Sequence, residues 1–154
     1  MGWWKFILRK MRHGTRLFGI EGLWFVRDWI LLGLITLSLK GGGYRRTRQW
    51  LKGLAGTSDA DGVNSDLPVK NICRQCAIAR RNFPWNTCLR GSLLLWFLLR
   101  CQGFESEICF GSAYIDAKFS AHAWVELGGR VLNDRPDIRS QYQVFACSPD
   151  LFPL

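Results

Sequence analysis

Apolar residues recur at helical intervals through the first two thirds of this chain and alternate in short runs in its last third. The first pattern predicts helices over Glu21–Leu39, Tyr44–Leu54, Pro68–Phe83 and from Cys88 to just before Gly103. The second predicts strands over Glu105–Ala113, Ala121–Leu127 and Arg130–Asp134, the last two joined by a turn at Gly128-Gly129. Helices followed by an antiparallel meander indicate an α+β fold.

The helix that begins at Cys88 is apolar on nearly all sides, so we expect it to lie at the centre of the core. Thr87 is a favourable N-cap residue, and Gly103 is a favourable residue to end the helix. Gly91 weakens the helix by up to about 1 kcal/mol relative to alanine, a cost that a close backbone approach at this position would explain.

The N-terminal helices are apolar and basic. The run Trp29–Leu39 has 11 residues without a charge, whereas a transmembrane helix needs about 20 apolar residues. It therefore predicts a buried helix, ended by the glycines at 41–43. Peripheral contact with a membrane through Trp3, Trp4 and Phe6 is the alternative.

A polar loop at Gly56–Asp66 divides the chain into two predicted parts. Residues 1–66 form a helical region that packs on or docks to the rest, and residues 67–154 carry the chemistry. The first 66 residues show no series of alternating strands. Arg45, Arg46 and Arg48 are expected on the solvent side of their helix.

Composition places the chain among folded, basic proteins. Hydrophobic residues make up 48% of it, and the formal net charge is +9, from 21 Lys+Arg against 12 Asp+Glu. This charge favours an acidic peptide, a membrane surface or nucleic acid as partner, with plain solubility as the alternative. We find no RNA-binding motif, phosphate loop or zinc pattern, so nucleic acid, metal and cofactor are not expected.

Cys88 is the leading candidate for a nucleophile, because a helix N-terminus favours a thiolate and its N–H groups favour an oxyanion. His122, in the strand-like run S-A-H-A-W-V-E-L, is the candidate base; the other histidine is His13. Asp134 is the candidate acid that orients His122, with Asp137 as the second choice. The non-catalytic alternatives are a buried structural cysteine for Cys88, a hydrogen-bonded core or edge histidine for His122 and a turn residue for Asp134.

The hairpin at Gly128-Gly129 tests this assignment. A two-residue loop would set Ala123 opposite Asp134, which puts the acid on the wrong face. A three-residue loop, or a bulge that shifts the register by one, would set His122 opposite Asp134. We therefore expect one of these, and a separation of about 4 Å between the Cys88 sulfur and a His122 ring nitrogen.

The other cysteines are expected to be structural and reduced. No signal peptide is evident, which indicates the cytoplasm. Cys73 and Cys76 form a C-x-x-C without a second pair at zinc-binding spacing, so core positions on a helix are favoured over a metal or redox site. The remaining three are Cys101, Cys109 and Cys147.

The segments C-L-R-G-S-L-L-L-W-F-L-L-R-C-Q-G-F and A-H-A-W-V-E-L-G-G-R-V-L-N-D resemble the transglutaminase-like leader peptidases of lasso peptide biosynthesis. The resemblance covers about half of the chain, from near Val69 to Asp134. It implies a papain/transglutaminase-like fold and a Cys88–His122–Asp134 triad that cleaves the leader from a ribosomally made precursor peptide.

Some members of the family that this chain resembles carry a strand-rich leader-recognition domain ahead of the peptidase. Because the first 66 residues show no series of alternating strands, we expect a stand-alone peptidase. Its partners would be the precursor peptide, a separate leader-recognition protein and an ATP-dependent lasso cyclase. Two other readings stay open: a non-catalytic peptide-binding scaffold, and an acyltransferase that passes the same thioester to an amine. We also expect the basic N-terminal region, with Trp3, Trp4 or Trp24 as anchors, to help dock the leader or its binding protein.

Overall fold

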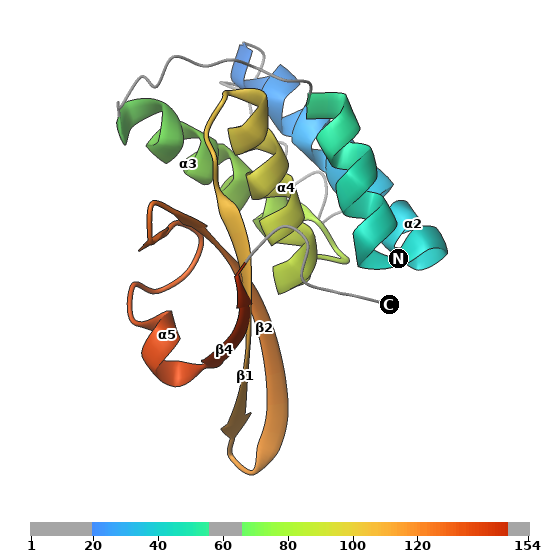
Figure 1. Ribbon diagram of the computed structural model, residues 1–154. Helices are drawn as coiled ribbons and strands as arrows, with labels where there is room; N and C mark the ends of the chain where they lie inside the picture. Colours follow the sequence, from blue (N-terminus) through green and yellow to red (C-terminus); the bar gives the residue numbers. More distant parts are fainter. Residues whose placement is uncertain (1–19, 56–65, 148–154) are drawn as a thin grey trace, which may run out of the picture.

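The computed structural model describes residues 20–55 and 66–147 (Figure 1). Its helices are α2 (Ile20–Ala55), α3 (Asp66–Asn82), α4 (Cys88–Cys101) and α5 (Ile138–Gln141). Its strands are β1 (Glu107–Ile115), β2 (Lys118–Leu127), β3 (Arg130–Val131) and β4 (Gln143–Cys147). The predictions about Trp3, Trp4, Phe6, His13 and most of the polar loop lie outside the described residues.

The α+β prediction is confirmed. The four strands form one antiparallel sheet in the order β3-β2-β1-β4, so β1, β2 and β3 make the expected meander. The short helix α5 and the strand β4, which pairs with β1, were not predicted. Both lie in the segment after Pro136, where the runs are too short to show a period.

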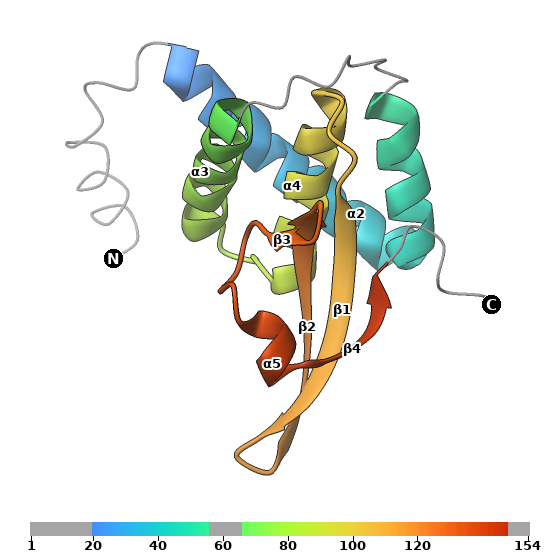
Figure 2. The ribbon, with the colours of Figure 1, turned by 60° about the vertical axis from the view of Figure 1, so that its left-hand side comes forward.

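Helix α4 is the centre of the core, as its composition predicts. Residues 91–99 are all buried. Helices α2 and α3 flank it, and one face of the sheet packs against it (Figures 1 and 2). Leu32 and Leu51 from α2 share a single apolar cluster with Val69 of α3 and Val125 of β2, so the N-terminal helix and the sheet are held by the same core. The boundary at residue 66 stays a prediction.

Helix α2 breaks where the three glycines predict. Gly43 has a φ angle of 68°, which glycine adopts without strain, and the helix resumes after it. The prediction that the first part is buried is wrong, because only one of its faces packs on the core. Large apolar residues remain exposed on the other: Leu23, Val26, Ile30, Leu34 and Leu37.

Two further predictions about α2, on the length of its apolar helix and on the exposure of its arginines, differ from the structure. By length and composition alone, Gly22–Ala55 is apolar enough to cross a membrane, a property that some core helices and signal sequences share. Arg45 and Arg46 are exposed as predicted, but Arg48 is not on the solvent side. Its guanidinium lies 4.8 Å from the ring centre of Trp96, a cation–π contact against the core.

Candidate functional site

His122 and Asp134 lie in direct contact. The Nε2 atom of His122 is 2.6 Å from Oδ2 of Asp134, and both side chains are 23% exposed. The other carboxylate oxygen of Asp134 accepts a hydrogen bond from the N–H of Arg135 at 2.8 Å. The ring of His122 also packs against Tyr142, 5.2 Å between ring centres, and against Trp124. The predicted pairing of these two residues is therefore present.

The turn before Asp134 differs from the prediction. Gly128 and Gly129 have φ angles of 56° and 78°, and Leu127 pairs with Arg130, so the loop has two residues. Positive φ at both positions is the turn that matches the twist of the flanking strands. The expectation of a three-residue loop is wrong, because a pair of glycines satisfies the shorter turn without strain.

Asp134 reaches His122 because β3 ends early. The strand stops at Val131, and the chain bends over residues 132–134, which removes Asp134 from the alternation of the strand. In a regular strand with this register, Asp134 would face away from His122. The early end of β3, and not a shifted register, therefore brings Asp134 to His122.

Asn133 holds that break in place, and sequence reasoning missed it. Its Oδ1 atom accepts the hydrogen bond of the Val125 N–H at 2.7 Å, in place of a backbone carbonyl. Its Nδ2 atom donates to Oγ of Ser92 at 3.0 Å, and Ser92 donates to the carbonyl of Ala123 at 3.0 Å. One amide therefore ties β2, α4 and the residue before Asp134 together. The available signal was an asparagine, a residue that competes with backbone pairing, directly before the acid.

Cys88 is the first residue of α4 and is half-buried. Thr87 is the N-cap, as predicted: its hydroxyl accepts from the Arg90 N–H at 3.4 Å. The Gly91 N–H donates to the carbonyl of Thr87 at 3.1 Å. Helix geometry leaves the N–H groups of Cys88 and Leu89 without partners inside the helix, so they are available to an anion.

Gly91 has a packing reason. A Cβ atom there would overlap the side chain of Arg80, which crosses α4 at this point from α3. The thiol of Cys76 also donates to the Gly91 carbonyl, with 3.7 Å between sulfur and oxygen. The close approach that we expected at this glycine is therefore that of a side chain, the arginine of the neighbouring helix.

Cys88 lies one turn before Ser92, on the same side of α4. Because Ser92 bonds the carbonyl of Ala123, the first turn of α4 lies beside the part of β2 that carries His122. The helix rise puts Cys88 about 6 Å along the axis from Ser92. In the described residues, no hydrogen bond joins the thiol to His122, so the separation of about 4 Å stays a prediction. Asp137 bonds Gln141 instead of His122.

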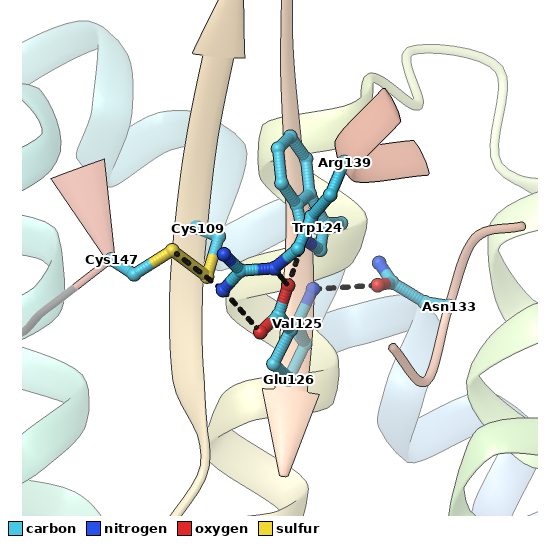
Figure 3. The surroundings of a disulfide bond; sticks show 7 residues. All are labelled: Cys109, Trp124, Val125, Glu126, Asn133, Arg139 and Cys147. Carbon is cyan, nitrogen blue, oxygen red and sulfur yellow. Dashed lines mark hydrogen bonds and ion pairs between the residues drawn. A yellow bond between two sulfur atoms is a disulfide. The ribbon is translucent and has the colours of Figure 1, made fainter. Parts of the chain in front are cut away.

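His122, Trp124 and Glu126 alternate along β2 and therefore share one face of the strand, and the last two are drawn in Figure 3. The indole N–H of Trp124 donates to Glu126 at 2.7 Å, and Arg139 of α5 holds both oxygens of the same carboxylate. The hydrogen bond from Arg139, with that of Trp124, keeps the pKa of Glu126 below its ordinary value although burial acts the other way. Trp124 and Glu126 are thus held by hydrogen bonds on the same face of β2 as His122.

Cys109 and Cys147 form a disulfide, so the prediction that all six cysteines are reduced is wrong for this pair (Figure 3). The two residues are direct partners in the β1–β4 ladder. The pairing could not be foreseen because β4 itself was not predicted. Their sulfurs lie near the Glu126 carboxylate, but the disulfide and the Arg139 ion pair already use these groups, so they do not form a metal site in this state.

Cys73 and Cys76 lie on α3, as expected for core or near-core positions. Burial raises the pKa of the Cys76 thiol to about 12 and also raises that of Cys73. Burial raises the pKa of Cys101 as well. These three thiols are therefore weak nucleophiles at neutral pH, because the thiolate is the reactive form.

The sequence profile of the transglutaminase-like superfamily matches residues 31–147, which is 117 of the 154 residues. The chain belongs to the transglutaminase-like superfamily. It is also 31% identical over 77 residues to the microcin J25-processing protein McjB of Escherichia coli. That match covers 50% of this chain and 36% of McjB. No solved structure matches.

These relatives confirm the resemblance that the segments around Cys88 and His122 indicated. The chain spans about a third of the length of McjB. The α+β architecture, with a central helix packed on an antiparallel sheet, agrees with the superfamily.

Proposed function

We propose that this protein is a cysteine peptidase that removes the leader from a ribosomally made precursor peptide during lasso peptide maturation. The observation that carries the proposal is the 2.6 Å contact between His122 and Asp134, beside the first turn of a helix that begins with Cys88. The likeness to McjB, whose name describes processing of microcin J25, supports the substrate class. Nucleophile, base and orienting acid are the parts of acyl-transfer chemistry.

The first step uses the ring nitrogen that Asp134 leaves free. Because Nε2 of His122 bonds the carboxylate, Nδ1 is the nitrogen that accepts the proton from the Cys88 thiol. The thiolate attacks the carbonyl carbon of the scissile peptide bond, and the negative charge moves to the carbonyl oxygen. The N–H of Cys88 lies at the helix end, where it would donate to this oxygen.

The second step closes the cycle. The tetrahedral adduct expels the amine of the core peptide, which takes the proton from His122, and leaves the leader as a thioester on Cys88. Water then loses a proton to His122 and attacks the thioester carbon. The leader leaves with a free carboxylate, and the thiol regains its proton. An amine in place of water would give acyl transfer, which product mass distinguishes from hydrolysis.

The proposal includes the expected partners and location. A separate leader-recognition protein would present the precursor, and an ATP-dependent cyclase would consume the freed core peptide. The expected location is the cytoplasm, with contact to a membrane surface through the apolar face of α2 as a variant. No cofactor takes part in the proposed steps.

The decisive experiment is mass spectrometry of a precursor peptide encoded next to this protein's gene. The peptide is incubated with its leader-recognition protein and either the wild type or Cys88→Ala. The wild type should release a leader whose mass shows one added water across the cleaved bond, and the variant should release none. Cleavage by Cys88→Ala would refute the assignment of Cys88.

Thiol reactivity separates the enzyme from the non-catalytic scaffold. With iodoacetamide at pH 7.5, Cys88 should react faster than Cys73, Cys76 and Cys101, whose pKa values are raised by burial. His122→Ala should slow the modification of Cys88 only. Equal rates at Cys88 and Cys73, unchanged by His122→Ala, would favour the scaffold.

A further inference from the structure

Asp134 also lines a groove whose lining does not include His122. Its volume is about 510 Å³, and its walls are α3 and the bend after β3, with Leu95 of α4 at its base. In the ribbon views the segment after β3 lies next to α3 (Figures 1 and 2). Because Asp134 belongs to both the groove and the pair with His122, the groove opens directly beside the proposed catalytic centre.

The charged side chains of the groove are mainly arginines. Arg74 and Arg80 come from α3, and Arg135 comes from the bend. Arg74 and Arg80 are six positions apart on α3, which places them about 120° apart around the helix, and the side chains of both reach the groove. The lining includes one carboxylate, Asp134, and that group is already bonded to His122 and to the backbone of Arg135.

Two of these guanidinium groups lack an acidic partner. Within residues 20–55 and 66–147, no carboxylate pairs with Arg74 or Arg80. The pair between Arg135 and Asp137 is long, 3.6 Å, and both side chains are exposed, so it is weak. The end of the Arg80 side chain lies over Gly91 of α4. The groove thus presents positive charge, and the one carboxylate of its lining is already bonded.

We infer that this groove binds a carboxylate side chain of the substrate peptide, an Asp or Glu close to the cleaved bond. Guanidinium groups pair with carboxylates through two parallel hydrogen bonds, which gives both orientation and charge complementarity. Leu95 and the aliphatic parts of α3 would contact the stem of the acidic side chain. The inference rests on the proposed function, because it takes the ligand to be the peptide that reaches Cys88.

The first test measures binding without chemistry. In a Cys88→Ala background, fluorescence anisotropy compares a fluorescein-labelled decapeptide that contains Glu with the same peptide that contains Gln. The Glu peptide should bind more tightly, and Arg74→Glu/Arg135→Glu should weaken it about tenfold while the Gln peptide changes little. Both arginines are exposed, so the variant should fold.

A matched control removes the effect of overall charge. Arg81→Glu/Lys118→Glu makes the same change in net charge at two exposed basic residues outside the groove. It should keep the preference for the Glu peptide. Equal binding of both peptides by the parent protein, or equal loss in the groove and control variants, would overturn the inference.

The second test measures cleavage in a peptide library and separates this inference from the proposed function. The wild type should cut peptides enriched in Asp or Glu near the cleaved bond. Arg74→Glu/Arg135→Glu should raise KM for these peptides with little change in kcat, and should shift the preference toward Lys or Arg. Cleavage without acidic preference would refute the groove alone, whereas acidic binding without any cleavage would refute the peptidase alone.

Discussion

The surroundings of β2 and the outer face of α2 differ in how far their side chains are satisfied by contacts within the protein. Around β2, the buried polar residues Ser92 and Glu126 and the indole of Trp124 all have hydrogen-bond partners. On α2, large apolar side chains are left uncovered, among them Leu23, 74% exposed, and Leu37, 67% exposed. The first pattern fixes side chains in one geometry, and the second is typical of a surface that contacts another molecule.

This contrast indicates which part of the fold needs an exact side-chain geometry. The proposed proton transfer requires His122 within hydrogen-bond reach of its partners, and the side chains around it are held by hydrogen bonds to one another and to the backbone. The stripe on α2, at intervals of three or four residues, needs only to present apolar area. If this division is right, single substitutions near β2 should have large and specific effects and those on α2 small ones, with salt dependence only where a charged residue of α2 is changed.

The largest effect is expected for the proposed triad. His122→Ala should reduce leader removal on the order of a thousandfold or more, as should Cys88→Ala, because these groups act as a unit. Asp134→Asn should lose less, because it misorients the base without removing it. Rates from mass spectrometry, with circular dichroism to verify folding, give the measurement. An active His122→Ala would contradict the assignment.

A smaller loss is expected when Asn133 is shortened. Asn133→Ala leaves the Val125 N–H without its acceptor and removes the bond that the Ser92 hydroxyl accepts, at a cost of about 1–3 kcal/mol of stability. It should also lower kcat about ten- to a hundredfold, because Asp134 then loses its fixed position. Urea unfolding and single-turnover rates measure the two effects.

Asn71→Ala, at an exposed position on α3, is the matched control and should change neither quantity. An unaltered kcat in a clearly destabilised Asn133→Ala protein would limit Asn133 to a structural role.

The ion pair between Arg139 of α5 and Glu126 of β2 should affect stability. Arg139→Ala leaves the Glu126 carboxylate, 3% exposed, with the Trp124 indole as its remaining side-chain donor, at a cost of about 1–3 kcal/mol at pH 7. Because the folded state lowers the pKa of Glu126, its contribution is complete above the ordinary value of 4.5 and is lost as pH falls through the lowered pKa. The difference between wild type and variant should therefore shrink at acidic pH.

Urea unfolding at pH 7 and pH 3 measures this difference. Arg135→Ala removes only a long, exposed ion pair and should cost less than about 1 kcal/mol at either pH. A pH-independent loss in Arg139→Ala would show that packing, and not the charge pair, is responsible.

The smallest effect is expected on the N-terminal helix. Arg45→Glu/Arg46→Glu should weaken binding of the leader-recognition protein a few-fold at low salt, with the difference vanishing near 0.5 M salt. Arg48 is kept, because it packs on Trp96. Calorimetry provides the affinities, with Arg81→Glu/Lys118→Glu as control. Unchanged affinity at low salt would count against docking through this segment.

Helix positions could be predicted largely from the sequence, because their signals are local. Thr87 caps α4, and Gly43 breaks α2, as their residue types require. The contact between His122 and Asp134 was predicted from chemistry, but its geometry was not. The turn type, the early end of β3 and the amide of Asn133 depend on partners in β2 and α4.

What the sequence determined by itself is the α+β order, the central apolar helix with Cys88 at its start, and the pairing of His122 with Asp134. Periodicity, capping and residue chemistry are local properties, so they can be read from residues that are close together in the sequence. Only the tertiary structure decided that Cys147 meets Cys109, that Arg80 lies over Gly91, and that α2 buries one face alone. Each of these joins segments far apart in the chain, and their contact depends on how whole elements pack, which no local pattern encodes.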